Sequence, residues 1–267
     1  MSSHTIRMEG VGKVFRRGRI ETRALERIDL EIGPGEFVAV VGPSGCGKST
    51  LMRLVAGLMP ASEGSVRYGD ELVESPRKDT GIVFQKANLV EWRNALDNVL
   101  LQVELRGLAV AAYRERAAAL LDALGIGEFK DRHPHELSGG MQQRAAIARA
   151  LVHAPDVLLM DEPFGALDAL TREQVRLDLE ALWLRDRMSV MFITHSVDEA
   201  VLLADKVVVM TERPGRVDRL LRVDLPRPRG LAARKAPEFI RLVDEITQEF
   251  LAHGVLDEGR TRALIGA

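Results

Sequence analysis

The sequence contains a single cysteine, Cys46, among 267 residues. It cannot form an internal disulfide, which excludes the small secreted domains that depend on such bonds. No apolar segment approaches the roughly eighteen residues that are needed to cross a bilayer. The first residues, 1–5, lack the basic and apolar regions of a signal peptide. We therefore expect a protein of the cytosol that does not itself span a membrane.

The net charge of the chain is also small, and aromatic residues are few. The 37 basic and 39 acidic residues nearly cancel to −2, which gives no electrostatic reason to expect binding to nucleic acid or to acidic lipid. Aromatic residues make up 4% of the chain, which disfavours the base-stacking surfaces of proteins that bind single-stranded nucleic acid. The remaining composition, 46% hydrophobic and 28% charged, is typical of a globular protein with one domain or one domain and a sub-lobe.

A glycine-rich segment lies between an apolar strand at 38–41 and an amphipathic helix that begins near Lys48. Glycine permits backbone conformations in which successive N–H groups turn toward an anion, and the helix start adds unpaired N–H groups and partial positive charge. The pattern predicts a phosphate-binding P-loop, in which Lys48 reaches the β- and γ-phosphates and Ser49 binds Mg²⁺. The alternative is a glycine turn without a ligand, which the flanking strand and helix disfavour. The candidate nucleotide-binding residues here are Gly42, Pro43, Ser44, Gly45, Cys46, Gly47, Lys48, Ser49 and Thr50.

The order of apolar segments predicts an α/β fold. A first strand is expected at 6–11, and alternation at 28–32 indicates a half-exposed antiparallel layer. The continuous apolar segments at 38–41, 157–161, 190–194 and 207–210 are instead typical of a parallel sheet. Further strands are expected at 64–68 and 81–85. Residues 95–153 are almost entirely helical in pattern, which predicts a helical sub-lobe inserted between strands, and Ser196 with Glu199 predicts a capping box.

A second group of small residues, Ser138, Gly139 and Gly140, also leads into a helix. Its hydroxyl and amide groups could hold another anion at a helix N-terminus. Taken alone, this short sequence is more typical of a helix cap.

Acidic and polar residues follow several of the predicted parallel strands. Asp161 and Glu162 end one strand, and Gln85 and His195 follow two others, so all four are expected at the same edge of the sheet. Asp161 could hold Mg²⁺ directly or through water, and Glu162 could orient or deprotonate an attacking water. The alternative is a solvated acidic strand end.

In this order the motifs resemble those of the ATP-binding subunit of ABC transporters. The resemblance covers residues 4–225, with Walker A at 42–50, the Q-loop at Gln85, the signature at 137–141, Walker B at 157–161 followed by Glu162, the D-loop at 166–168 and the switch histidine His195. It implies a P-loop NTPase with a parallel sheet core, an N-terminal antiparallel β layer and an inserted α-helical subdomain at about 88–153. The ABC ATPase domain would occupy residues 1–225, and a short helical tail would occupy 226–267.

The resemblance also implies roles and partners. Phe15 would stack on adenine, Gln85 would sense Mg²⁺ and the membrane subunit, Asp168 would belong to the nucleotide site, and His195 would contact the γ-phosphate. The family's ATP sites lie between two subunits packed head to tail, so we expect a homodimer or a pseudo-symmetric ABC dimer with ATP and Mg²⁺ as cofactors. Integral membrane permease subunits and a periplasmic or lipid-anchored solute-binding protein would complete an importer, with this chain on the cytoplasmic side of the inner membrane and no role for nucleic acid. Because Cys46 lies in the loop, we also expect its alkylation to inhibit and ATP to protect.

Within the family, the chain is most similar to ATPases that power import of nitrate, sulfonates, taurine and related small compounds. Segments 90–99 and 212–216 and Met141 carry this similarity, although Glu91 stands where those importers commonly have proline. The alternatives are an exporter or lipid-handling ATPase, a soluble ABC ATPase that acts on nucleic acid or ribosomes, and a non-catalytic nucleotide-binding module. The last is disfavoured by Glu162 and His195.

Overall fold

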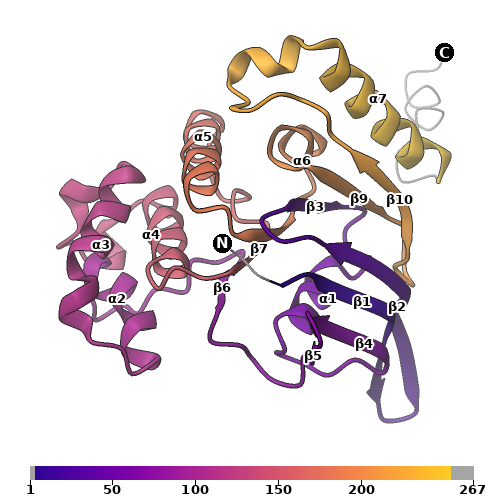
Figure 1. The fold of residues 1–267 in the computed structure, drawn as a ribbon, viewed down its shortest axis with the longest axis horizontal. Helices are drawn as coiled ribbons and strands as arrows, with labels where there is room; N and C mark the ends of the chain where they lie inside the picture. The colour runs from indigo at the N-terminus through magenta and orange to yellow at the C-terminus, as the bar shows by residue number, and fades with distance from the viewer. Residues whose placement is uncertain (1–3, 254–267) are drawn as a thin grey trace.

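The computed structural model describes residues 4–253, and its centre is a six-stranded sheet in the order β10-β9-β3-β8-β7-β6 (Figure 1). The strands β9, β3, β8, β7 and β6 run parallel, and β10 pairs antiparallel with β9 at one edge. Their bounds are β3 Phe37–Val41, β6 Thr80–Val83, β7 Val157–Asp161, β8 Ser189–Ile193, β9 Lys206–Met210 and β10 Val217–Arg222. The predicted parallel core is confirmed, whereas the mostly exposed β10 gave no strand signal in the sequence.

A second sheet is antiparallel throughout, in the order β2-β1-β4-β5. Its strands are β1 Ile6–Arg17, β2 Ile20–Ile32, β4 Glu63–Tyr68 and β5 Glu71–Leu72. The antiparallel layer is therefore confirmed, but β1 and β2 extend well beyond the predicted segments. Their extra length forms an exposed hairpin end, where no buried face imposes an alternating pattern on the sequence.

The strand β3 is apolar at every position because it faces two cores. Phe37, Ala39 and Val41 pack in the core that the helices cover on one side of the central sheet. Val38 and Val40 pack in the other core, which includes residues of α1 (Lys48–Val55) and of the antiparallel sheet. Successive side chains of a strand point to opposite faces, so a strand buried on both faces leaves no position for a polar residue. The helix α1 lies between the two sheets (Figure 1).

Three helices between β6 and β7 form the predicted helical block, at the left of Figure 1. They are α2 Ala95–Leu105, α3 Val110–Ala123 and α4 Gly139–Leu151, with short 3₁₀ turns at Gly127–Phe129 and Pro134–Glu136. The remaining α-helices are α5 Ala169–Asp186, α6 Val197–Leu203 and α7 Pro237–Ala252. Within residues 4–253, none of the helices combines the length and apolar character that a membrane crossing requires.

The helix α7 falls within the predicted helical tail and packs on the protein's own core. Its buried residues Phe239, Leu242 and Ile246 join the same hydrophobic cluster as residues of α6 and the central sheet. The division of the chain at residue 225 stays a prediction, and the end of the predicted tail, 254–267, lies outside the described residues.

The predicted capping box of α6 is only half correct. Ser196 Oγ accepts a hydrogen bond of 3.3 Å from the Glu199 backbone N–H, as expected. The Glu199 carboxylate does not return to the Ser196 backbone, because it accepts a hydrogen bond of 2.6 Å from the Thr194 hydroxyl, which in turn accepts one from the Ser196 N–H. Thr194 thus takes the place that the carboxylate would hold in a capping box.

Candidate nucleotide-binding site

The glycine-rich loop between β3 and α1 has a backbone that other residues would strain. Gly45 and Gly47 have φ angles of 78° and 109°, which lie in the left-handed region. A Cβ on Gly47 would also lie 2.7 Å from Leu25 Cδ2 and 3.0 Å from the Ala24 carbonyl oxygen. Glycine at this position therefore allows the loop to approach β2 closely.

Lys48, the first residue of α1, directs its ammonium group into this loop. Its Nζ donates hydrogen bonds of 2.7 Å to the Gly42 carbonyl and 2.8 Å to the Pro43 carbonyl, and the side chain is buried. A lysine held this way places a positive charge among the backbone groups of the loop, which is suitable for binding phosphate.

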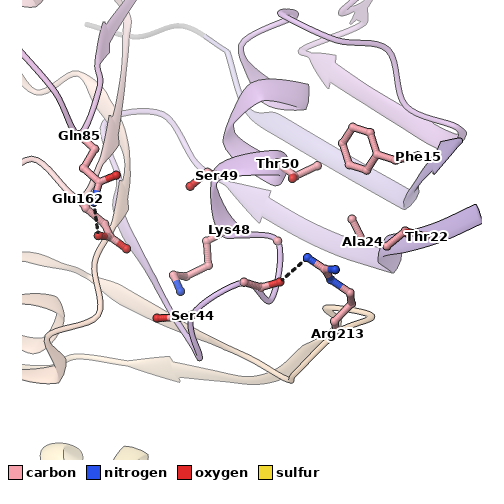
Figure 2. Close-up of a pocket in the computed structure, with 12 residues that line it drawn as sticks. Phe15, Thr22, Ala24, Ser44, Lys48, Ser49, Thr50, Gln85, Glu162 and Arg213 are labelled. Carbon is pink, nitrogen blue, oxygen red and sulfur yellow. Dashed lines mark hydrogen bonds between the residues drawn. The ribbon is translucent and has the colours of Figure 1, made fainter. Parts of the chain in front are cut away.

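A cavity of about 370 Å³ opens beside the loop (Figure 2). Its walls come from distant parts of the chain: the two long strands of the antiparallel sheet, the P-loop, α1, the segments after β6 and β7, and the turn between β9 and β10. The residues that line it are Phe15, Thr22, Ala24, Ser44, Gly45, Gly47, Lys48, Ser49, Thr50, Gln85, Glu162 and Arg213. The sequence had singled out nine of these twelve, all except Thr22, Ala24 and Arg213.

Ser49 and Asp161 form a pair at the inner end of the loop. The Ser49 hydroxyl donates a hydrogen bond of 2.8 Å to Asp161 Oδ1. Burial raises the pKa of the Asp161 carboxyl above its usual range, the Ser49 hydrogen bond opposes this shift, and the negative charge of Glu162 adds to it. A hydroxyl and a buried carboxylate, with the Gln85 amide in the lining of the same cavity, supply oxygen donors of the kind that Mg²⁺ prefers. The residues present therefore fit a magnesium ion bound next to a phosphate.

Glu162 lies at the centre of a polar group at the carboxyl edge of the central sheet. Its Oε2 accepts a hydrogen bond of 3.1 Å from Gln85 Nε2 and lies 3.5 Å from His195 Nδ1. The strands β6, β7 and β8 are adjacent and parallel, so the residues that follow them meet at this edge, as predicted. The strand β6 ends at Val83, two residues before Gln85, which the sequence had placed in the strand.

The backbone of Glu162 is unusual for a residue with a side chain. Its φ is 46°, in the left-handed region, and its N–H donates a hydrogen bond of 2.9 Å to the Ile193 carbonyl. Such conformations cost energy and are concentrated at functional sites. Here the strained turn directs the carboxylate toward the cavity (Figure 2).

The Cys46 side chain does not face the cavity. It is 1% exposed and packs in the hydrophobic core beneath the loop, 3.1 Å from the position of a Cβ on Gly42. Burial also raises the pKa of its thiol. The backbone of Cys46 still belongs to the loop, but the expectation of ready alkylation conflicts with this burial.

The second predicted anion site lies elsewhere in the chain. Ser138 is the N-cap of α4, and its Oγ accepts a hydrogen bond of 3.2 Å from the Met141 N–H. Asp168 is the N-cap of α5, and hydrogen bonds from Thr171 lower the pKa of its carboxyl. A Cβ on Gly140 would lie 3.2 Å from Thr171 Cγ2, so these two helix starts are close to each other. None of the residues Ser138, Gly139, Gly140 and Asp168 lines the cavity, and α4 is well separated from α1 in Figure 1.

Comparisons with known proteins identify this arrangement. Residues 25–165, just over half of the chain, match the ABC transporter family. The chain belongs to that family.

Individual relatives agree with this assignment. The chain is 45% identical to the taurine import ATP-binding protein TauB of Rhizobium johnstonii over 230 residues, which cover 84% of this chain and 87% of that protein. It is 39% identical to the aliphatic sulfonates import ATP-binding protein SsuB of Bacillus licheniformis over 238 residues, covering 89% and 91%. Among solved structures, it is similar to the dimeric structure of MJ0796, described as a bacterial ABC transporter cassette, with a TM-score of 0.75, 32% identity and coverage of 83% and 100%.

The same cassette has also been solved in a post-hydrolysis state bound to ADP and phosphate, and this second structure matches the chain with a TM-score of 0.72 and 32% identity. The predicted family, the P-loop NTPase fold and the assignment as an ATPase are therefore confirmed.

Proposed function

We propose that this chain is the ATP-hydrolysing subunit of an importer for a small solute, with taurine, sulfonates, nitrate and related compounds as the candidate class. Support comes from relatives that are named for taurine and sulfonate import and that match the chain over most of both lengths. The observation that carries the proposal is the meeting of Lys48, Ser49 and Glu162 at one cavity beside a glycine-rich loop.

ATP would lie along this cavity with its base near Phe15 and its phosphates in the P-loop. The loop N–H groups and Lys48 would hold the β- and γ-phosphates. Ser49 and Asp161, with Gln85, would hold Mg²⁺, which would neutralise charge on the phosphate oxygens.

Glu162 is the proposed general base. Its carboxylate would take a proton from a water molecule as the water oxygen forms a bond to the γ-phosphorus, and the bond between that phosphorus and the β–γ bridging oxygen would break to leave ADP and inorganic phosphate. Gln85 and His195, both at Glu162 Oε2, would orient the carboxylate for this transfer.

We propose that two copies close around the nucleotides. One chain carries two helix starts suited to anions, α1 and α4, but only the first opens onto the cavity. In a head-to-tail pair, Ser138, Gly139 and Gly140 of one copy would face the γ-phosphate held by the other. This arrangement would use both helix starts of each chain and is consistent with two-fold symmetry. The dimeric form of the similar cassette supports this arrangement.

Membrane permease subunits and a solute-binding protein would complete the importer, with this chain at the cytoplasmic face of the membrane. The segment after Gln85 supports a docking role, because Trp92 is 81% exposed and stands next to the unusual Glu91. A large exposed aromatic side chain of this kind is typical of an interface residue.

The deciding experiment is to purify the intact membrane complex and measure ATP turnover with candidate solutes, each presented with its binding protein. Stimulation by a sulfonate or by nitrate supports the proposal and identifies the solute. Turnover that responds instead to lipid, DNA or ribosomes would overturn the importer assignment.

A further inference from the structure

The turn between β9 and β10, residues 211–216, lies against the P-loop although it is far away in sequence. Gly215 donates a backbone hydrogen bond of 2.9 Å to the Ala24 carbonyl, and the Glu26 N–H donates one of 3.0 Å to the Gly215 carbonyl. A Cβ on Gly215 would lie only 2.1 Å from the Cys46 carbonyl oxygen. The turn is therefore in close contact with β2 on one side and with the P-loop on the other.

Hydrogen bonds within the turn hold its shape. The single proton of the Thr211 hydroxyl is shared between the Glu212 carbonyl at 3.0 Å and the Pro214 carbonyl at 3.3 Å, and the oxygen accepts a bond of 3.0 Å from the Arg216 N–H. The Arg216 guanidinium forms an ion pair of 2.7 Å with Glu26 on β2. A side chain that projects from this turn consequently begins from a fixed position, which reduces the entropy that it loses on binding a ligand.

Arg213 projects from this turn into the lining of the nucleotide cavity. Its Nη2 donates a hydrogen bond of 3.3 Å to the Gly45 carbonyl of the P-loop. In Figure 2 its guanidinium lies across the cavity from the Phe15 ring, with Thr22 and Ala24 of β2 between them. That single long bond to a carbonyl uses one of the five N–H donors of the guanidinium.

The charged residues that line the cavity indicate what Arg213 could bind. Among the described residues that line the cavity, Lys48 and Arg213 are the cations, and Glu162 is the acidic residue. Lys48 is assigned to the β- and γ-phosphates, at the end of the cavity where Gln85 and Glu162 lie. Figure 2 shows Arg213 on the Phe15 side of Lys48, where a nucleotide bound as proposed would pass from its base to its phosphates. Arginine binds phosphate through charge-assisted, often bidentate hydrogen bonds.

We propose that Arg213 is a nucleotide-binding residue whose guanidinium donates hydrogen bonds to the α- and β-phosphate oxygens beside Gly45. The inference rests on the proposed function, because it requires ATP in this cavity. It adds a ligand that the sequence motifs do not contain, supplied by the β9–β10 turn.

The test is a titration of the full-length protein with Mg²⁺-ADP and Mg²⁺-ATP in a calorimeter, comparing the wild type with Arg213→Ala, Arg213→Gln and Arg213→Lys. We expect the dissociation constants of both nucleotides to rise on the order of tenfold in the alanine and glutamine variants, and less in the lysine variant. Because a phosphate contact releases counterions, wild-type binding should also weaken more steeply with added salt than binding by Arg213→Ala. Arg219→Ala is the matched control: it removes an arginine from β10, outside the turn, that pairs with Glu245 and Glu249 on α7 and does not line the cavity.

The outcomes separate this proposal from the function on which it rests. A wild-type protein that binds neither nucleotide would overturn both. If the wild type binds and Arg213→Ala binds equally well, the role of Arg213 is wrong and the ATPase assignment stands. Glutamine can still donate to the Gly45 carbonyl, so full affinity in Arg213→Gln would also overturn the phosphate contact, by showing that the bond to the loop suffices. Should the alanine variant fail to fold, the glutamine and lysine variants decide between these outcomes.

Discussion

The Thr194 hydroxyl donates a hydrogen bond of 2.6 Å to the buried carboxylate of Glu199, and so ties the residue before His195 to the helix that follows it. The other carboxylate oxygen of Glu199 lies 3.7 Å from Arg172 Nε, and Arg172 Nη2 donates a bond of 3.0 Å to the Leu167 carbonyl. A continuous set of polar contacts therefore joins the loop of His195 to the loop that precedes α5 and contains Asp168.

We expect Glu199→Ala to loosen the His195 loop and lower kcat roughly 10- to 100-fold, with little change in KM for ATP, because a catalytic group displaced by about an ångström loses much of its effect. Steady-state ATPase assays of the membrane complex measure both constants. The control is Asp198→Asn, one position earlier on α6, where the carboxylate lies 3.9 Å from Arg234 and is half exposed. Equal kcat for Glu199→Ala and the wild type would show that Thr194 and Glu199 only cap the helix.

Glu162→Gln should abolish turnover and retain nucleotide binding. The amide keeps the size of the carboxylate and can still contact Gln85, but it cannot accept the proton of the attacking water, so a loss of about 10²- to 10⁴-fold in rate is expected. ATP should then accumulate uncleaved in a closed dimer, which size-exclusion chromatography with and without Mg²⁺-ATP would detect. Normal turnover in this variant would remove Glu162 from its proposed role.

Much of this site follows from the sequence because its residues occupy ends of strands. Gln85, Glu162 and His195 follow three neighbouring parallel strands, and the geometry of such a sheet brings strand ends together whatever the details of the loops. The antiparallel layer and the helical block were equally clear, because the hydrophobic period changes at their boundaries.

What the sequence did not show depends on contacts between distant segments. Arg213 reaches the cavity only because Gly215 pairs with Ala24 and Glu26, about 190 positions away, and no local pattern encodes that pairing. The side-chain direction of Cys46 is a second case, because the loop motif fixes the backbone but not which side chains point into the core. The strand β10 is a third, since an exposed edge strand has no buried face to give it an alternating pattern.

Alkylation of Cys46 should be slow in the folded protein. The side chain is 1% exposed, and burial raises the pKa of the thiol, so the reactive thiolate is scarcer at neutral pH than for an ordinary cysteine. Iodoacetamide at pH 7.5 should label less than a tenth of the protein in the time that labels the urea-unfolded chain completely, as mass spectrometry can measure. Rapid labelling that ATP suppresses would instead restore the expectation made from the sequence.

His153 should make the protein less stable in mild acid. Burial, together with the positive charges of Arg106 and Arg116, lowers the pKa of its imidazole to about 4, although the Thr80 carbonyl and Asp79 act in the opposite direction. The unfolded chain has a pKa of about 6.5 for this group and binds a proton that the folded protein excludes, so this contribution to stability is present above about pH 6.5 and is lost as the pH falls toward 4.

The variant His153→Asn has no such proton to bind, so its melting temperature should fall less between pH 7 and pH 5 than that of the wild type. His135→Asn, which changes an exposed histidine, should follow the wild type. Identical pH profiles for wild type and His153→Asn would mean that the ring is accessible to protons in the folded state.

Gly215→Ala should disturb the P-loop from outside it. The new Cβ would lie 2.1 Å from the Cys46 carbonyl and 2.9 Å from Met210 Cε. The methionine can move, but the carbonyl belongs to the loop backbone, so either the turn or the loop must shift, at a cost of about 1–3 kcal/mol in unfolding free energy. Because the same turn carries Arg213, nucleotide affinity should fall together with stability, as urea denaturation and calorimetric titration of one preparation would show.

Gly230→Ala is the control for this substitution, since a Cβ there meets no atom within 4 Å and the backbone is extended. If Gly215→Ala matches that control in both measurements, the contact between the β9–β10 turn and the P-loop is looser than the structure indicates.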